Sequence, residues 1–226
     1  MQKSVIIVAG GKGLRMGHAL PKQFLPLGGK PVLMHTIEAF AQYDPSMLIV
    51  LVLPVEQQDY WKTLCLDYRF DISHTLADGG ETRFHSVLNG LKATPDSGLI
   101  AVHDGVRPFV SRDTIVRSFL SAARFGAAIP VTIPVESVRE VVGNDSFARN
   151  RDEFRMVQTP QTFKAEVLKE SYLQMFSPNF TDDASVVEAS GFTIQLVDGN
   201  VENIKITTPF DLMVAEAIIA RSAAKV

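Results

Sequence analysis

The chain has 226 residues, 46% of them apolar, and a formal net charge of −3. This length supports one full hydrophobic core, and we expect a single domain over residues 1–226 that carries an insertion. Positive and negative charges are mixed without a basic tail or a charge block, which argues against nucleic acid or a membrane surface as a partner. No apolar stretch has the length of a signal-peptide core or a membrane span, so we expect a cytoplasmic protein.

A short apolar run over residues 5–8 leads into a glycine-rich loop. A β-branched run without helical periodicity predicts a buried strand. Three glycines follow it: Gly10, Gly11 and Gly13. Glycines let the main chain approach a ligand and present bare N–H groups to it. Three cations lie in and just beyond the loop: Lys12, Arg15 and Lys22. One phosphate would not require so many, and the stretch therefore predicts a polyphosphate site.

Two better-known phosphate-binding loops do not fit this stretch. The NTPase loop needs Ser or Thr directly after its lysine, where this chain has Gly13. The dinucleotide fingerprint G-x-G-x-x-G fails because Gly11, Gly13 and Gly17 are one residue too widely spaced. A glycine-rich turn with solvated cations is the plain alternative for this loop alone. The nearby Pro21-Lys22-Gln23 favours the polyphosphate interpretation.

Helical and extended segments alternate along most of the chain. Helices are expected at about residues 31–43, 55–68, 84–91, 113–125, 164–175 and 209–223. Strands are expected at about residues 5–8, 47–53, 72–76, 99–102, 127–131, 193–197 and 203–207. This alternation predicts an α/β fold with a doubly wound, mostly parallel sheet. Ligands of such sheets bind beyond the carboxyl ends of the strands, where the glycine-rich loop lies.

Two further loops are expected at this edge of the sheet. Gly79 and Gly80 follow a strand and again allow main-chain contact with a ligand. Asp104 follows the next strand, and a carboxylate near several cations is suited to hold Mg²⁺ on triphosphate oxygens. The plain alternative is that Asp104 pairs with Arg107 and stiffens the loop. His103 is expected to be structural.

The regular alternation breaks at Pro134. Residues 135–142 show a period of two, residues 143–146 are turn formers, and residues 147–151 form a polar return. The pattern predicts a protruding β-hairpin arm over residues 134–152. Because the arm has too few apolar residues for a core of its own, we expect it to pack on a second copy of the chain in a homodimer.

A pair of acids, Asp182 and Asp183, stands at the expected start of another helix. Asp is a favoured N-cap residue, and acids in the first turn interact well with the helix dipole. Capping is therefore a sufficient structural explanation for both carboxylates.

Seven short motifs occur in a fixed order: A-G-G-x-G-x-R-M, P-K-Q, D-G-G-x-x-R, H-D-G-x-R-P, T-P-Q-x-F, T-D-D-A-S and N-I-K-x-T. This ordered set resembles the sugar nucleotidyltransferases. Within them it is most similar to the cytidylyltransferase family that joins CTP to 2-C-methyl-D-erythritol 4-phosphate in non-mevalonate isoprenoid synthesis. The resemblance implies a Rossmann-like nucleotidyltransferase fold, a Mg²⁺ requirement, and CTP and a polyol phosphate as ligands.

The resemblance also implies roles for individual residues. Two cations, Arg15 and Lys22, would be catalytic and stabilise the pentacoordinate phosphorus. Nucleotide contacts would come from Ala9, Gly10, Gly11, Gly13, Gly80, Glu81 and Ser86. Substrate contacts would come from Asp104, Arg107, Ser137, Arg151, Thr159, Lys205 and Thr207, and Asp104 would also contact the metal. Position 10 is glycine in this chain, where the family frequently has alanine. A loop that binds its ligand through the backbone should tolerate this departure. The arm is one residue short, so either Ser137 or Val138 takes the position of the family's substrate-contacting threonine.

The expected reaction is in-line attack by the sugar phosphate on the α-phosphorus of CTP. A phosphate monoester dianion is already a nucleophile at neutral pH, so alignment and charge neutralisation suffice. Two alternatives stay open. The same scaffold could use ribitol 5-phosphate, since both substrates present a phosphate and hydroxyls. An inactive nucleotide-binding regulator is disfavoured by the joint presence of Arg15, Lys22 and Asp104.

Overall fold

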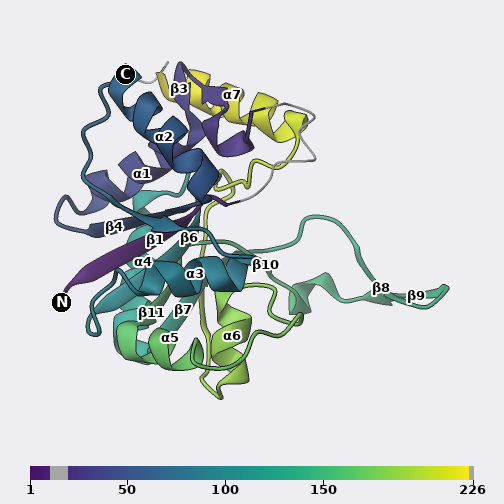
Figure 1. Ribbon diagram of the computed structural model, residues 1–226. Helices are drawn as coiled ribbons and strands as arrows, with labels where there is room; N and C mark the ends of the chain where they lie inside the picture. Colours follow the sequence, from purple (N-terminus) through teal and green to yellow (C-terminus); the bar gives the residue numbers. More distant parts are fainter. Residues whose placement is uncertain (11–19, 224–226) are drawn as a thin grey trace.

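The computed structural model describes residues 1–10 and 20–223, and an eight-stranded sheet lies at its centre. The strand order is β10 (Met156–Val157), β7 (Ala127–Thr132), β11 (Gln161–Lys164), β6 (Leu99–Asp104), β1 (Lys3–Val8), β4 (Leu48–Leu53) and β5 (Thr75–Asp78), with β12 (Gln195–Asp198) also paired to β7. The β6-β1-β4-β5 half is parallel throughout, whereas β10 and β11 run antiparallel to their neighbours. The prediction of a mostly parallel sheet is confirmed (Figure 1).

Helices cover both faces of this sheet, as the alternation of segments predicted. One face is covered by α1 (Val32–Tyr43), α2 (Val55–Asp67) and α4 (Arg112–Phe125). The other is covered by α3 (Arg83–Leu91), α5 (Ala165–Ser171) and α6 (Asp183–Ala189). Successive strand residues point to opposite faces, so Val5 and Ile7 pack under the first layer and Ile6 under the second. All three are fully buried, which explains the continuous apolar run of β1.

Two predicted strands begin at least two residues later than expected, and one predicted helix ends at least two residues earlier. The strand expected at 72–76 begins only at Thr75, because the preceding His74 ring bonds Ile72 O and accepts a hydrogen bond from the Trp61 indole at 2.9 Å. β12 starts two residues later than expected. The helix expected to reach residue 175 ends at Ser171, where the Gln174 amide turns back to bond the carbonyls of Ser171 and Val186.

The segment at 203–207 was expected to be a strand and is not one. Among the described residues, one main-chain bond joins it to a segment distant in the sequence, from Ile206 N to Val106 O at 2.9 Å. Its first residue, Asn203, uses its side-chain amide on Thr159 O instead. Ile206 is fully buried and Lys205 is exposed, so burial alternates along this segment as it does along a strand.

The predicted hairpin arm is confirmed. Strands β8 (Val138–Val142) and β9 (Asp145–Arg149) pair with each other alone, and Figure 1 shows them projecting from the body. A short helix, η3 (Arg151–Glu153), leads back toward β10. Nearly every arm residue is exposed.

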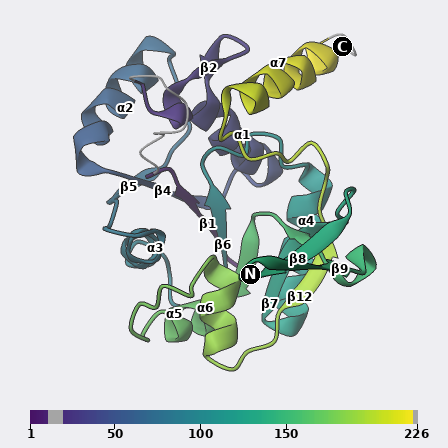
Figure 2. The ribbon, with the colours of Figure 1, turned by 90° about the vertical axis from the view of Figure 1, so that its right-hand side faces the viewer.

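The C-terminal helix α7 (Pro209–Ala223) packs beside the small ribbon of β2 (Pro26–Leu27) and β3 (Lys30–Pro31), as Figure 2 shows. Ala215 joins Leu27, Val32 and Ile206 in a separate small core there. None of the helices within the described ranges is long and apolar enough to cross a bilayer.

Candidate active site

A cleft of about 510 Å³ lies at the carboxyl ends of the parallel strands. Each of β1, β4, β5 and β6 ends at its wall, as expected for ligand sites in such sheets. The lining residues of greatest chemical interest are Ala9, Gly10, Lys22, Gly80, Glu81, Arg83, Ser86, Asp104 and Lys205. Eight of the predicted site residues therefore line one cleft together with Arg83, although they come from widely separated parts of the chain.

The two glycine positions differ in how tightly they are packed. A Cβ at Gly80 would meet the Cβ and carbonyl carbon of His85 at 2.5 and 2.7 Å. Gly80 N also donates to Ser86 Oγ at 3.0 Å, and Ser86 Oγ donates to Thr82 O. At Gly10 a Cβ would meet nothing closer than 3.9 Å. Position 10 thus has room for a Cβ such as that of the alanine frequent in the family, whereas position 80 requires glycine for close approach.

Lys22 opens the short helix η2 (Lys22–Phe24) on the phosphate-loop side of the cleft. The next residue, Gln23, is 1% exposed and donates from its amide to Ala9 O and Gln57 Oε1, each at 2.7 Å. Gln23 thus anchors the P-K-Q motif to the end of β1, a role that the sequence did not assign. Three residues predicted for this loop, Gly11, Gly13 and Arg15, lie outside the described residues.

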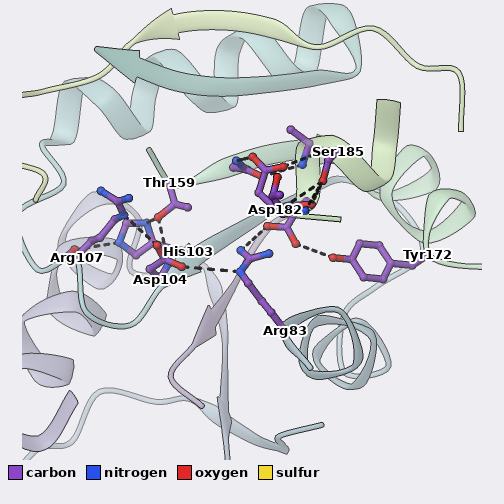
Figure 3. A network of polar contacts seen from close by, with 12 residues as sticks. Arg83, His103, Asp104, Arg107, Thr159, Tyr172, Asp182 and Ser185 are labelled. Carbon is purple, nitrogen blue, oxygen red and sulfur yellow. Dashed lines mark hydrogen bonds and ion pairs between the residues drawn. The ribbon is translucent and has the colours of Figure 1, made fainter. Parts of the chain in front are cut away.

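Asp104 stands at the tip of β6 near Arg83 and Arg107 (Figure 3), and Lys205 is a third cation beside it. Its Oδ2 lies 3.0 Å from Arg107 Nε and 3.1 Å from Lys205 Nζ, and its Oδ1 lies 4.0 Å from Arg83 Nε. Burial opposes its ionisation, but the charges of Arg83, Lys205 and Arg107 outweigh that effect and hold the pKa of Asp104 well below its usual range. The ion pair of Asp104 with Arg107, which the sequence offered as the alternative to a metal contact, is therefore present.

The donor set around Asp104 bears on the expected metal. Among the described residues there is no group of three or more His, Cys, Asp or Glu side chains that could hold an ion. Asp104 Oδ2 is shared by two cations, which leaves Oδ1 as its less crowded oxygen. A single carboxylate suits a Mg²⁺ ion held mainly by substrate phosphates, and it does not suit an ion held by the protein alone.

A buried chain of hydrogen bonds braces Asp104 from behind. Asp104 N donates to Thr159 Oγ1 at 3.1 Å, Thr159 Oγ1 bonds His103 Nδ1 at 3.0 Å, and His103 Nε2 bonds Arg107 O at 3.0 Å. Both ring nitrogens of His103 are thus used, and burial lowers its pKa to about 4. The expectation that His103 is structural is confirmed. The structure places Thr159 and Arg107, both predicted to bind substrate, behind the cleft wall.

Arg83 was missed as a site residue, although it ends the D-G-G-x-x-R motif. Its side chain lines the cleft and pairs with Asp183 Oδ2 at 2.6 Å. The capping explanation is confirmed for Asp182, which forms a capping box with Ser185 at the start of α6. Asp183 does more than begin a helix, because it is fully buried and binds Arg83. The two partners are 100 residues apart, so no local pattern could have joined them.

Three predicted substrate residues lie away from the cleft lining. Ser137 is exposed just before β8, and neither it nor Val138 reaches the cleft within this chain. Arg151 donates to Val135 O at 2.6 Å at the base of the arm. Thr207 donates from both N and Oγ1 to Asp211 Oδ2 at 2.8 Å, so it stabilises the start of α7.

A mostly parallel α/β sheet with a glycine-flanked, cation-lined cleft at its carboxyl edge defines a nucleotidyltransferase. The chain matches the family described as 2-C-methyl-D-erythritol 4-phosphate cytidylyltransferase over residues 4–221 and belongs to that family. A relative of that name from Bacteroides fragilis is 59% identical over 219 residues, which cover 97% of this chain and all of the relative.

Solved structures agree with this assignment. The crystal structure of 4-diphosphocytidyl-2C-methyl-D-erythritol synthase from Anaerococcus prevotii is similar with a TM-score of 0.83 and 30% identity, covering 97% of this chain and 99% of that one. A 2-C-methyl-D-erythritol 4-phosphate cytidylyltransferase from Thermus thermophilus has a TM-score of 0.80 and 32% identity, with 97% and 100% covered. The predicted fold class and family are confirmed.

Proposed function

We propose that this chain transfers CMP from CTP to 2-C-methyl-D-erythritol 4-phosphate and releases pyrophosphate, a step of non-mevalonate isoprenoid precursor synthesis. The name shared by its relatives supports this activity. The observation that carries it is one cleft lined by Lys22, the Gly80 loop, Asp104 and Lys205. Such a cleft offers a cation for a triphosphate, main-chain groups that can hydrogen-bond a base, and a lysine for a second phosphate.

The chemistry needs alignment and charge neutralisation more than proton transfer. An oxygen of the acceptor's phosphate attacks the α-phosphorus, and the bond from that phosphorus to the bridging oxygen breaks with its electron pair leaving on pyrophosphate. The dianionic nucleophile requires no general base. Burial lowers the pKa of His103 to about 4, and both of its ring nitrogens are bonded behind the cleft.

Roles for the individual residues follow from their places. Lys22, with Arg15, would neutralise charge that develops at the α-phosphate. Gly80, Glu81 and Ser86 would read cytosine, and Lys205 would bind the phosphate of the acceptor.

Magnesium is part of the proposal. Bound to the triphosphate, the ion would neutralise phosphate charge and favour the departure of pyrophosphate. Asp104 is the residue whose carboxylate would contact it, with Oδ1 facing away from Arg107 and Lys205.

We also propose a homodimer formed through the arm, residues 134–152. Its strands leave Val141, Val142 and Phe147 at 71%, 57% and 50% exposure, which favours burial against another surface. Arg151 lies in the same arm and away from its own cleft, which supports a role for it in the partner's cleft. Because its substrates are metabolites, we assign the reaction to the cytoplasm, and cell fractionation would test this.

Pyrophosphate release tests the activity directly. Purified protein with CTP and Mg²⁺ receives either 2-C-methyl-D-erythritol 4-phosphate or ribitol 5-phosphate. We expect release with the first substrate and little with the second. A preference for ribitol 5-phosphate would replace the proposed acceptor. CTP binding without release from either acceptor would indicate an inactive nucleotide-binding regulator.

A further inference from the structure

Asp183 is a fully buried carboxylate that the start of α6 does not require. Its neighbour Asp182 already caps the helix through Ser185. Asp183 instead accepts from Arg83 Nη2 at 2.6 Å and from the Tyr172 hydroxyl at 2.7 Å, one on each oxygen. Burying a charge is costly unless hydrogen-bond partners satisfy it. Arg83 and Tyr172 supply these partners, and their contacts with Asp183 hold both side chains in place.

Arg83 therefore has one defined position. It is the first residue of α3, and its guanidinium reaches between two carboxylates (Figure 3). Nη2 binds Asp183, while Nε lies 4.0 Å from Asp104 Oδ1. The Tyr172 ring that supports Asp183 is itself stacked on Phe84, with ring centroids 4.6 Å apart. A planar guanidinium can serve two carboxylates with different nitrogens, whereas a lysine ammonium is a point charge.

We propose that Arg83 is a positioning residue, held by Asp183 and Tyr172, which fixes the Asp104 carboxylate in the orientation that the acceptor substrate requires. Arg107 and Lys205 both contact Oδ2 of Asp104, so these two cations hold the planar carboxylate from one side only. Arg83 faces Oδ1 and completes the restraint. The inference rests on the proposed function, because Asp104 lies 3.1 Å from Lys205 Nζ, the group to which the proposed function assigns the acceptor's phosphate.

The charge balance supports this assignment. Arg83 places its positive charge 4.0 Å from Oδ1, the oxygen that Arg107 and Lys205 do not contact. Arg83 itself stays charged despite burial because Asp183 and Asp104 both face it, and its pKa is raised. Asp183 engages Nη2 of Arg83 and Asp104 faces its Nε, so we expect Arg83 to act through Asp104.

A double-mutant cycle tests the proposal on the full-length enzyme. Arg83→Gln should lower kcat/KM for the polyol phosphate by about 10- to 100-fold, as misplacement of a site group does, and change the KM of CTP less than about twofold. Arg83→Lys should lower this kcat/KM nearly as much, since lysine keeps the positive charge but lacks the planar guanidinium with its several nitrogens. Tyr172→Phe removes one hydrogen bond, should fold, and should show a smaller loss of the same kind. In an Asp104→Asn background, Arg83→Gln should have no further effect.

Asp44→Asn is the matched control, because it breaks a Lys3–Asp44 ion pair of 2.9 Å at the opposite end of β1 and should leave the kinetics unchanged. Independent, additive losses from Arg83→Gln and Asp104→Asn would overturn the proposal, as would a loss confined to the KM of CTP. A wild-type chain without turnover would refute the proposed function alone. Crystal structures would then decide the inference: an Asp104 carboxylate oriented alike in wild type and Arg83→Gln would overturn it.

Discussion

Gly80→Ala should damage CTP binding, and the structure gives the size of the effect. The added Cβ would lie 2.5 Å from His85 Cβ, 2.7 Å from His85 C and 2.9 Å from Ser86 N. Two of these three atoms belong to the main chain and cannot rotate away. Overpacking of this kind costs about 1–3 kcal/mol. The loop can relieve it only by moving, which breaks the bond from Gly80 N to Ser86 Oγ, worth about 0.5–1.5 kcal/mol.

We therefore expect the KM of CTP to rise roughly 10- to 100-fold, which corresponds to about 1.4–2.8 kcal/mol. Steady-state pyrophosphate release at varied CTP measures this change, and urea unfolding separates it from a loss of stability. Gly10→Ala is the matched control, because its Cβ would have 3.9 Å of space and lines the same cleft. Equal KM values for both variants would refute the close-approach argument at Gly80.

Three further predictions concern charged groups. Lys22→Ala should lower kcat much more than it raises the KM of CTP, by about 2.7–4 kcal/mol of barrier, and wild-type turnover would contradict its role. Asp104→Asn should shift the Mg²⁺ titration of activity to higher concentration; an unaltered titration with lowered stability would make Asp104 a purely structural partner of its cations. Asp44 has a pKa of about 2 because the side chains of Lys3 and Ser46 donate to it. The ionised Asp44 side chain stabilises the folded protein at pH values above its pKa in the unfolded chain. This stabilisation is lost as the pH falls through its pKa in the folded chain. Asp44→Asn should therefore cost about 1 kcal/mol near neutral pH and only a small part of that near pH 2, where the folded-state carboxyl is becoming protonated, measured by urea unfolding.

The sequence predicted those features whose cause is local. The apolar run of β1 and the tip position of Asp104 depend on neighbouring residues, and both agree with the structure. The 203–207 segment misled the prediction, because burying Ile206 and exposing Lys205 produces a strand-like alternation without a ladder. Thr207 lies in a matching motif, but its observed bonds serve the helix that follows.

The polar network of the site could not be predicted in the same way. The pairing of Arg83 with Asp183, and that of Thr159 with His103, join segments that only the folded sheet brings together. A motif can name one member of such a pair without naming the other. Arg107 shows the same limit, since its motif marks it as part of the site but does not distinguish a substrate contact from a brace of Asp104.

The arm gives the prediction that separates a two-chain site from a one-chain site. If residues 134–152 cross to the partner, Lys22→Ala and Arg151→Ala subunits are each inactive alone but complement each other when mixed. In a mixed dimer, one site combines a sound body from one chain with a sound arm from the other. With random exchange, half of the dimers contain one subunit of each variant, and one of the two sites in such a dimer is intact. About a quarter of the wild-type sites should therefore return. Exchange verified by mass spectrometry without recovered activity would place Arg151 in the site of its own chain.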